Sequence, residues 1–124
     1  MSIRRGHARV LFHEGAFAED TMRSGRAGAK ALREARSRFE RDGVEVKELR
    51  RCDSEGRDGT KLPACFKVYL PAPSGKFGMV LRFVRDREGI ALRYLAFGVR
   101  HHPRDSNAQT AYEIAHRRLH GQLP

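Results

Sequence analysis

The fold of this 124-residue chain is decided by three runs in its second half: Cys65–Leu70 (CFKVYL), Lys76–Val84 (KFGMVLRFV) and Ile90–Val99 (IALRYLAFGV). In the first two runs, apolar side chains occupy every second position, which is the period of a β-strand with one buried face. The third run is apolar on both faces except at Arg93, which is typical of a strand inside a sheet. Short segments with Pro, Gly and Asp separate the runs, so we expect three neighbouring antiparallel strands.

The first half of the chain predicts one strand and two helices. Ala8–His13 is rich in β-forming residues and predicts a short opening strand. A short helix is expected over Ala16–Arg23, and a longer one over Ala27–Arg41, where apolar residues recur at helical spacing. Gly43 is expected to cap the longer helix, and the segment Val44–Val46 that follows it is expected to be extended.

A third helix is expected near the C-terminus, where Ser106 and Gln109 have the spacing of a capping box. Its last turns carry cations that complement the helix dipole, namely His116, Arg117, Arg118 and His120. The order strand, helix, helix, three strands, helix predicts an α+β fold. We expect an antiparallel sheet of about four strands, two N-terminal helices and a C-terminal helix, in a single domain over residues 1–124.

The charge of the chain indicates its class of partner. Its 25 Lys and Arg residues outnumber its 15 Asp and Glu residues, which gives a formal net charge of +10. The excess is concentrated in residues 61–124, which hold 11 basic and 4 acidic side chains. Such a field attracts polyanions and favours nucleic acid, the ribosome or an acidic protein as partner. The alternative is a basic surface that serves solubility alone.

The sequence also argues against some classes of protein. No apolar run approaches the roughly 18 residues needed to span a membrane, and Met1–Arg9 lacks the apolar core of a signal peptide. Cys52 and Cys65 are too few for a disulfide framework. We therefore expect a cytoplasmic protein with no membrane partner.

Several short motifs stand in an order known from one family. The pair Phe66-Lys67 lies in a strand that leads through Ser74-Gly75 into the apolar strand Met79–Val84. The next strand ends in Gly98-Val99-Arg100, and Tyr112 follows in the C-terminal helix. In this order of elements, over nearly its whole length, the chain resembles the RelE/ParE superfamily of toxins from toxin–antitoxin systems.

The resemblance implies an activity. Several RelE-like toxins cleave messenger RNA in the ribosomal decoding site without a metal, by attack of a ribose 2′-hydroxyl on the adjacent phosphate. For this chain it implies a ribosome-dependent mRNA endoribonuclease with no cofactor and no metal site. The implied partners are the ribosome, messenger RNA and a cognate acidic antitoxin. The reaction needs a base at the hydroxyl, cations around the phosphate and a proton donor for the leaving oxygen.

The resemblance places catalysis on five residues. Arg100 is the candidate for binding the transition-state phosphate, because its planar fork pairs with two phosphate oxygens. Lys67 matches the strand lysine of the family, and His101 and His102 are candidate bases or acids. Tyr112 matches the family's C-terminal tyrosine by order only, so a packing role is equally open. For the charged residues, the alternative is an ordinary solvated side chain.

Three further residues are expected to bind RNA. Tyr69 stands where the family often has a second lysine and could stack on a base. Many relatives carry an arginine at the position of Gly78, and here Lys76 or Arg82 would have to replace it. Strand alternation places these three side chains with Lys67 on one face of the sheet. The opposite, core-facing set is Phe66, Val68, Leu70, Phe77, Met79, Leu81 and Phe83.

Other functions stay open. The chain could be a ParE-like toxin that targets DNA gyrase, a catalytically silent member, or a small basic nucleic-acid-binding module unrelated to the family. His116, His120 and Glu113 have a helical spacing that can hold a metal. Such residues near a helix end are more often solvated, and we expect no metal there.

Overall fold

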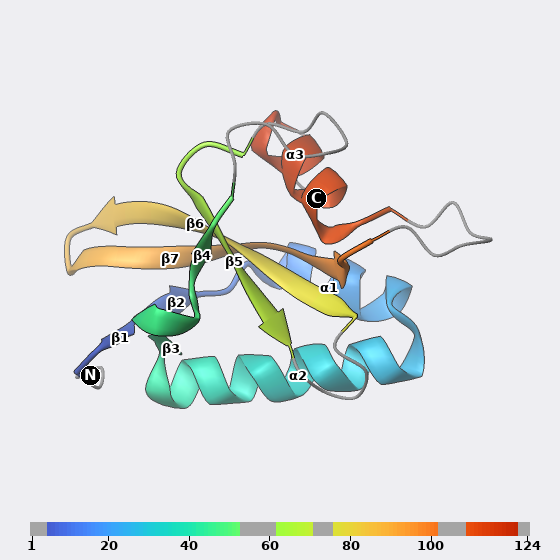
Figure 1. Ribbon diagram of the computed structural model, residues 1–124, viewed down its shortest axis with the longest axis horizontal. Coiled ribbons are helices and arrows are strands. Elements are labelled where there is room, and N and C mark those ends of the chain that lie inside the picture. Colours follow the sequence, from blue (N-terminus) through green and yellow to red (C-terminus); the bar gives the residue numbers. More distant parts are fainter. Residues whose placement is uncertain (1–4, 53–61, 71–75, 102–108, 122–124) are drawn as a thin grey trace.

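The computed structural model describes residues 5–52, 62–70, 76–101 and 109–121. Its centre is a five-stranded sheet of order β2-β7-β6-β5-β4. The strands of this sheet are β2 (Val10–Leu11), β4 (Arg50–Arg51), β5 (Cys65–Leu70), β6 (Phe77–Asp86) and β7 (Gly89–Val99). The described helices are α1 (Glu14–Arg23), α2 (Gly25–Asp42), α3 (Ala111–Leu119) and a 3₁₀ turn, Val46–Glu48. Helices α1 and α2 pack on one face of the sheet and α3 on the other (Figure 1).

The predicted α+β class is confirmed, and the three long strands pair antiparallel as expected. The opening strand differs from the prediction because it is broken at Arg9. Its first part, β1 (His7–Ala8), pairs with β3 (Val44–Glu45), and its second part, β2, runs parallel to β7. The Arg9 carbonyl accepts a hydrogen bond from Leu92 N, and its side chain forms ion pairs with Asp86 and Glu88.

Helices α1 and α2 each begin two residues before the predicted start. Helix α1 begins at Glu14, where His13 Nδ1 accepts a hydrogen bond from the backbone N–H of Ala16. Gly43 caps α2 as expected, with a φ of +74° that favours glycine. Helix α3 has a capping box made by Thr110 and Glu113. The sequence predicts that box at Ser106, which lies outside the described residues.

The predicted core face of the sheet is confirmed with one correction. Six of the seven residues expected there pack with α1 and α2 in the main hydrophobic cluster. Phe83 is instead 40% exposed. The β6–β7 hairpin extends past the end of α2 (Figure 1), so no helix covers this part of the strand.

A β-bulge in β7 explains why its sequence is apolar on both faces. Val80 pairs with Ala96, but the next residue, Leu81, pairs with Tyr94, so Leu95 is an extra residue in β7. The extra residue changes the alternation. Leu92, Tyr94, Phe97 and Val99 all contact the main cluster, while Leu95 and Ala96 both face α3 in the second cluster.

The edge of β7 beside the bulge is closed by a buried ionic cluster that the sequence did not predict. Strand β2 pairs with only two residues of β7 and ends before Tyr94. Beyond that point, Asp20 of α1 accepts hydrogen bonds from Tyr94 Oη, Phe97 N and both terminal nitrogens of Arg118 of α3. Arg118 Nη1 also donates to Leu95 O, and Arg23 Nη2 donates to Phe97 O.

This cluster joins three elements. Asp20 is 0% exposed and Arg118 is 2% exposed, and both charges are compensated where they are buried. Asp20 is paired with Arg118 and Arg23, and Arg118 is paired with Asp20 and Glu19. Burial opposes the charged form of Arg118, but hydrogen bonding and charge from Asp20, then Glu19, raise its pKa above the ordinary value. The sequence predicts Arg118 as one of several helix-end cations. Its burial instead makes it the link between α3, β7 and α1.

Replacing one partner of this pair should destabilise the fold. In Arg118→Met, the buried carboxylate of Asp20 loses one of its two counter-charges and keeps only that of the partly exposed Arg23, which should cost up to about 3–5 kcal/mol. Arg117→Met, at the exposed neighbouring position, is the matched control and should change stability by less than about 0.5 kcal/mol. Denaturant unfolding followed by circular dichroism measures both. Equal, small decreases in the two variants would contradict the assigned role.

Candidate functional site

Four of the predicted site residues meet at one end of the sheet. Lys67 and Tyr69 come from β5, Arg100 directly follows β7, and Tyr112 lies in the first turn of α3. The guanidinium carbon of Arg100 lies 3.6 Å from the centre of the Tyr69 ring. Lys67 Nζ lies 5.7 Å from the centre of that ring and 5.5 Å from the centre of the Tyr112 ring. We call these four residues the cation–tyrosine cluster.

Two glycines make room for this cluster. Tyr69 pairs across the strands with Gly78, and Gly78 pairs with Gly98, so a row without side chains crosses the sheet beside Tyr69. A Cβ atom on Gly78 would lie 3.2 Å from Cγ of Arg100 and 3.7 Å from Oη of Tyr112. The space beside Gly78 is therefore filled by the side chain of Arg100.

Gly98 positions α3 in the same way. A Cβ atom there would lie 3.2 Å from the backbone nitrogen of Ala111 and 3.5 Å from its Cα. A Cβ atom at this position would be in a tighter contact than most, so glycine favours this close approach of the first turn of α3 to the strand. This approach brings Tyr112 from the helix to the cluster.

One cation of the site was missed by the sequence analysis. Arg50 of β4 pairs with Lys67, and its guanidinium carbon lies 5.0 Å from the centre of the Tyr69 ring. A strand of two residues is too short to show alternation, so only the Arg50-Arg51 doublet before a polar segment could have signalled it.

Tyr69 is more acidic than an ordinary tyrosine. Its partial burial raises the pKa, but hydrogen bonding to Lys67, the charges of Lys67 and Arg100 and hydrogen bonding to Arg100 together outweigh that effect. The net result is a pKa below the ordinary value of 10.0. The nearby cations thus stabilise the phenolate.

Tyr112 is shifted in the opposite direction. Burial, followed by the proximity of Tyr69, raises its pKa to about 12, although Arg100 opposes the shift. Its ring also packs against the second hydrophobic cluster beneath α3. The packing role considered from the sequence is therefore present together with the contact to Lys67.

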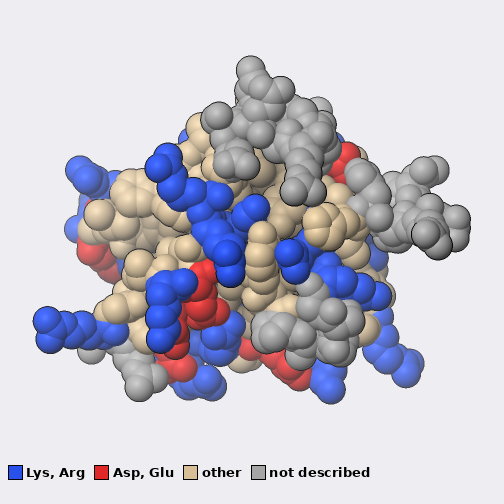
Figure 2. Space-filling view, in the orientation of Figure 1, with Lys and Arg blue, Asp and Glu red and all other residues tan. Residues whose placement is uncertain are grey.

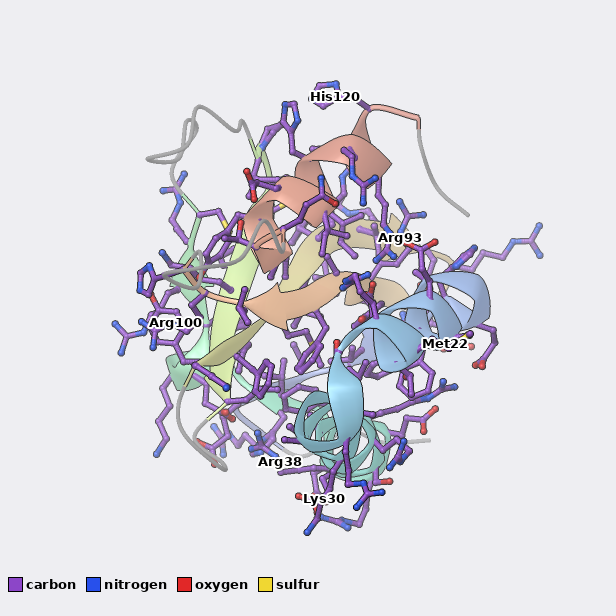
Figure 3. The ribbon with its side chains drawn as sticks, turned by 90° about the vertical axis from the view of Figure 1, so that its right-hand side faces the viewer. Met22, Lys30, Arg38, Arg93, Arg100 and His120 are labelled. Atoms are coloured by element: carbon purple, nitrogen blue, oxygen red, sulfur yellow. The ribbon has the colours of Figure 1, made fainter. Side chains whose placement is uncertain are left out.

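The surface around the cluster is basic. Figure 2 shows Lys and Arg side chains gathered in the middle of the face that carries β4 and β5, between α3 and α2. Figure 3 shows Arg100 directed to the same side, away from α1 and α2. Within the described residues, no carboxylate forms an ion pair with Lys67 or Arg50. This surface therefore suits an anion.

The other predicted residues lie apart from the cluster or outside the described residues. Arg82 shares the predicted sheet face, but it pairs with Cys65 and Arg93 at the far end of β5. The backbone carbonyl of Lys76 accepts a hydrogen bond from the backbone N–H of Arg100. The side-chain amine of Lys76 lies 5.6 Å from the centre of the Phe77 ring. His101 is exposed beside Arg100. His102 lies outside the described residues.

The histidines of α3 are close to one another. The rings of His116 and His120 lie 4.5 Å apart between centres. In the described ranges there is no group of three or more His, Cys, Asp or Glu side chains suited to a metal ion. In the same ranges, no helix is long and apolar enough to cross a membrane.

Comparison of the chain with protein-family models, with curated proteins and with solved structures found no match. The class of the protein, an α+β fold with a basic surface at one end of its sheet, therefore rests on its own geometry.

The opposite shifts of the two tyrosines can be measured directly. The chain has three tyrosines; Tyr69 should ionise below pH 10.0, whereas Tyr112 and the buried Tyr94 should ionise above it. A titration of tyrosinate absorbance in the folded protein should show one early step, and Tyr69→Phe should remove it. Because the pKa of Tyr69 is lowered on folding, its stabilising contribution is present above pH 10.0 and disappears as the pH falls through the lowered value. An early step that persists in Tyr69→Phe would contradict the assignment.

Proposed function

We propose that this protein is a RelE-like toxin that cleaves messenger RNA on the ribosome without a metal ion, and that an acidic antitoxin neutralises it in the cytoplasm. The observation that carries the proposal is the convergence of Lys67, Tyr69, Arg100 and Tyr112 from three elements. They come from three separate segments of the chain, and the resemblance points to all four of them.

The cluster suits the chemistry of phosphodiester cleavage. Arg100 and Lys67 supply positive charge for the phosphate oxygens, whose negative charge grows as the 2′-oxygen attacks. Arginine stays charged at every accessible pH and can contact two oxygens at once. Arg100 lies over one face of the Tyr69 ring, so a base would stack on the other face of that ring. A surface that binds RNA without cleaving it would use the same cations, and the experiments below separate the two functions.

Removing Arg100 should abolish cleavage and leave the fold intact. Arg100→Ala removes one interaction with the transition state, which typically lowers the rate by about 10²–10³-fold. The assay is induced expression with mapping of new mRNA 5′ ends, together with cleavage of a messenger on purified ribosomes. Lys30→Gln, on the exposed side of α2 (Figure 3), is the control and should cleave like the unaltered protein.

The outcomes separate the functions. Growth arrest without new 5′ ends would favour a ParE-like or catalytically silent protein over a nuclease. A protein that neither slows growth nor cleaves messenger, but binds RNA, would favour the basic nucleic-acid-binding module. Undiminished cleavage by folded Arg100→Ala would remove Arg100 from the site.

RNA binding itself should depend on the other cations of the surface. Lys67→Gln should weaken binding of a short single-stranded RNA and reduce the slope of log affinity against log salt by about 0.7 for each phosphate that is no longer neutralised. Lys30→Gln should leave the slope unchanged if RNA binds specifically to this face. Fluorescence anisotropy at several salt concentrations measures both variants. Equal slopes in the two variants would place the RNA elsewhere.

A further inference from the structure

We propose that Cys52 and Cys65 are a redox modification site, at which a peroxide converts the two thiols into a reversible disulfide that ties strand β4 to β5. They are the two cysteines of the chain, and both are thiols in the structure. Two cysteines are too few for a disulfide framework, but transient disulfides in reducing compartments are usually catalytic or redox-sensing. The inference does not depend on what the basic surface binds.

The two cysteines lie opposite each other on neighbouring strands. The antiparallel ladder of β4 and β5 reaches Arg51, which pairs with Phe66, so the next pair in this register is Cys52 with Cys65. The backbone bears this out, because Cys52 N donates a hydrogen bond to Cys65 O at 3.1 Å. Residues that are directly opposite in an antiparallel ladder place their side chains on the same face of the sheet.

The packing of the two side chains agrees with this register. Both contact the second hydrophobic cluster beneath α3, so both thiols lie on the sheet face that carries α3. Cys65 is buried there, with 3% of its surface exposed, whereas Cys52 is partly exposed. An oxidant in solution therefore reaches Cys52 first, with Cys65 behind it as the second thiol.

The spacing of the strands suits a disulfide that is easily reduced. Opposite Cα atoms in an antiparallel ladder are about 4.5 or 5.5 Å apart, and a disulfide spans roughly 4.4–6.8 Å. The Cβ atoms are about 4.5–5.5 Å apart, which is at or beyond the usual upper limit of about 4.5 Å for a disulfide. The bond would therefore carry strain, and strained disulfides are the labile, regulatory ones. In the thiol form Cys65 Sγ donates to Pro63 O at 3.4 Å, so its side chain rotates as the bond forms.

The reaction balances with hydrogen peroxide as the oxidant. Peroxide transfers an oxygen atom to Cys52, which becomes a sulfenic acid, and water is released. The sulfur of Cys65 then attacks the sulfenic sulfur. The S–S bond forms, the S–O bond breaks, and the hydroxyl group leaves with the thiol proton as a second water. Burial raises the pKa of the Cys65 thiol to about 11, although Arg82 opposes the shift, so Cys65 does not react first with peroxide.

The disulfide would change how firmly β4 is held. This strand is at the edge of the sheet, and its two exposed residues pair only with β5. Arg50 lies directly opposite Lys67, and like charges in this position destabilise the pairing of strands. A covalent bond two residues further along the same face would hold Arg50 beside the Tyr69 ring. The redox state thereby controls the order of the edge strand that contributes Arg50 to the basic surface.

Mass spectrometry of the folded protein, before and after treatment with dilute hydrogen peroxide, tests the site. The oxidised protein should be a monomer that is lighter by two hydrogen atoms, with one pair of peptides linked through Cys52 and Cys65. Dithiothreitol should reverse the change completely. The melting temperature of the oxidised monomer should be higher by about 5–10 °C, because the closed ring over residues 52–65 restricts the unfolded chain. Hydrogen exchange of the Cys52 amide should slow, because β4 opens less often.

Two single variants are the matched controls. In Cys65→Ala, oxidation of Cys52 should stop at the sulfenic acid, which dimedone traps. In Cys52→Ala, the buried Cys65 should keep its thiol under the same conditions. Neither variant should gain thermal stability on oxidation, and unfolding curves of the reduced variants establish that each is folded.

Several results would overturn the inference. One is oxidation of Cys52 to a sulfinic acid while the Cys65 thiol stays intact, and another is a disulfide between two chains. A bond that forms only in denaturant, or one that changes neither the melting temperature nor the exchange of the Cys52 amide, would also overturn it. These measurements involve no RNA, so failure of the proposed function to appear on the ribosome would leave their result in place.

Discussion

The structure depends on the buried ion pair between Asp20 and Arg118. Strand β2 is too short to cover β7 beyond Arg93, and the bulge leaves backbone groups of Leu95 and Phe97 facing that edge. Water cannot satisfy them there, because α1 and α3 both pack against this part of the strand. Asp20, Arg23 and Arg118 take the place of a neighbouring strand and hydrogen-bond these groups. The same contacts fix α3 to the sheet.

The position of the functional site follows from how α3 is held. Its nine residues span about 14 Å, with Arg118 bound to Asp20 near one end and Ala111 against Gly98 at the other. Tyr112 lies next to the second contact, so its hydroxyl reaches the sheet where Gly78 leaves space. The bulge contributes as well, because it turns both Leu95 and Ala96 toward α3 and gives the helix an apolar surface to pack on.

The sequence predicted the parts of this arrangement that periodicity controls. Alternation over 65–84 placed Lys67 and Tyr69 opposite the core, and the helical spacing of apolar residues identified α2. The sequence could not predict features that depend on the contacts of one residue with residues far away in the chain. Arg118 looks like any helix-end cation until its partner 98 residues away is known, and a strand of two residues, such as the one that holds Arg50, has no period. The bulge at Leu95 is hidden because the residues around it are apolar on both faces. Phe83 was wrongly predicted to be in the core. Alternation assigns a residue to one face of the sheet, but it does not show how far the helices cover that face.

The sheet face opposite α1 and α2 has two parts along its length, an apolar part covered by α3 and a charged part beyond it. Near its middle α3 covers Val80, Leu95 and Ala96, and there the face is apolar. Beyond the first turn of α3 the strands carry Lys67, Arg50 and Arg100, held together by contacts with tyrosine rings. Like charges so close together repel one another, and a ring face offsets only part of that repulsion. The aromatic rings thus allow a cluster of cations to persist without carboxylate partners for Lys67 and Arg50 among the described residues. A phosphate placed among these cations would relieve the remaining repulsion, and this is the electrostatic basis of the proposed RNA binding.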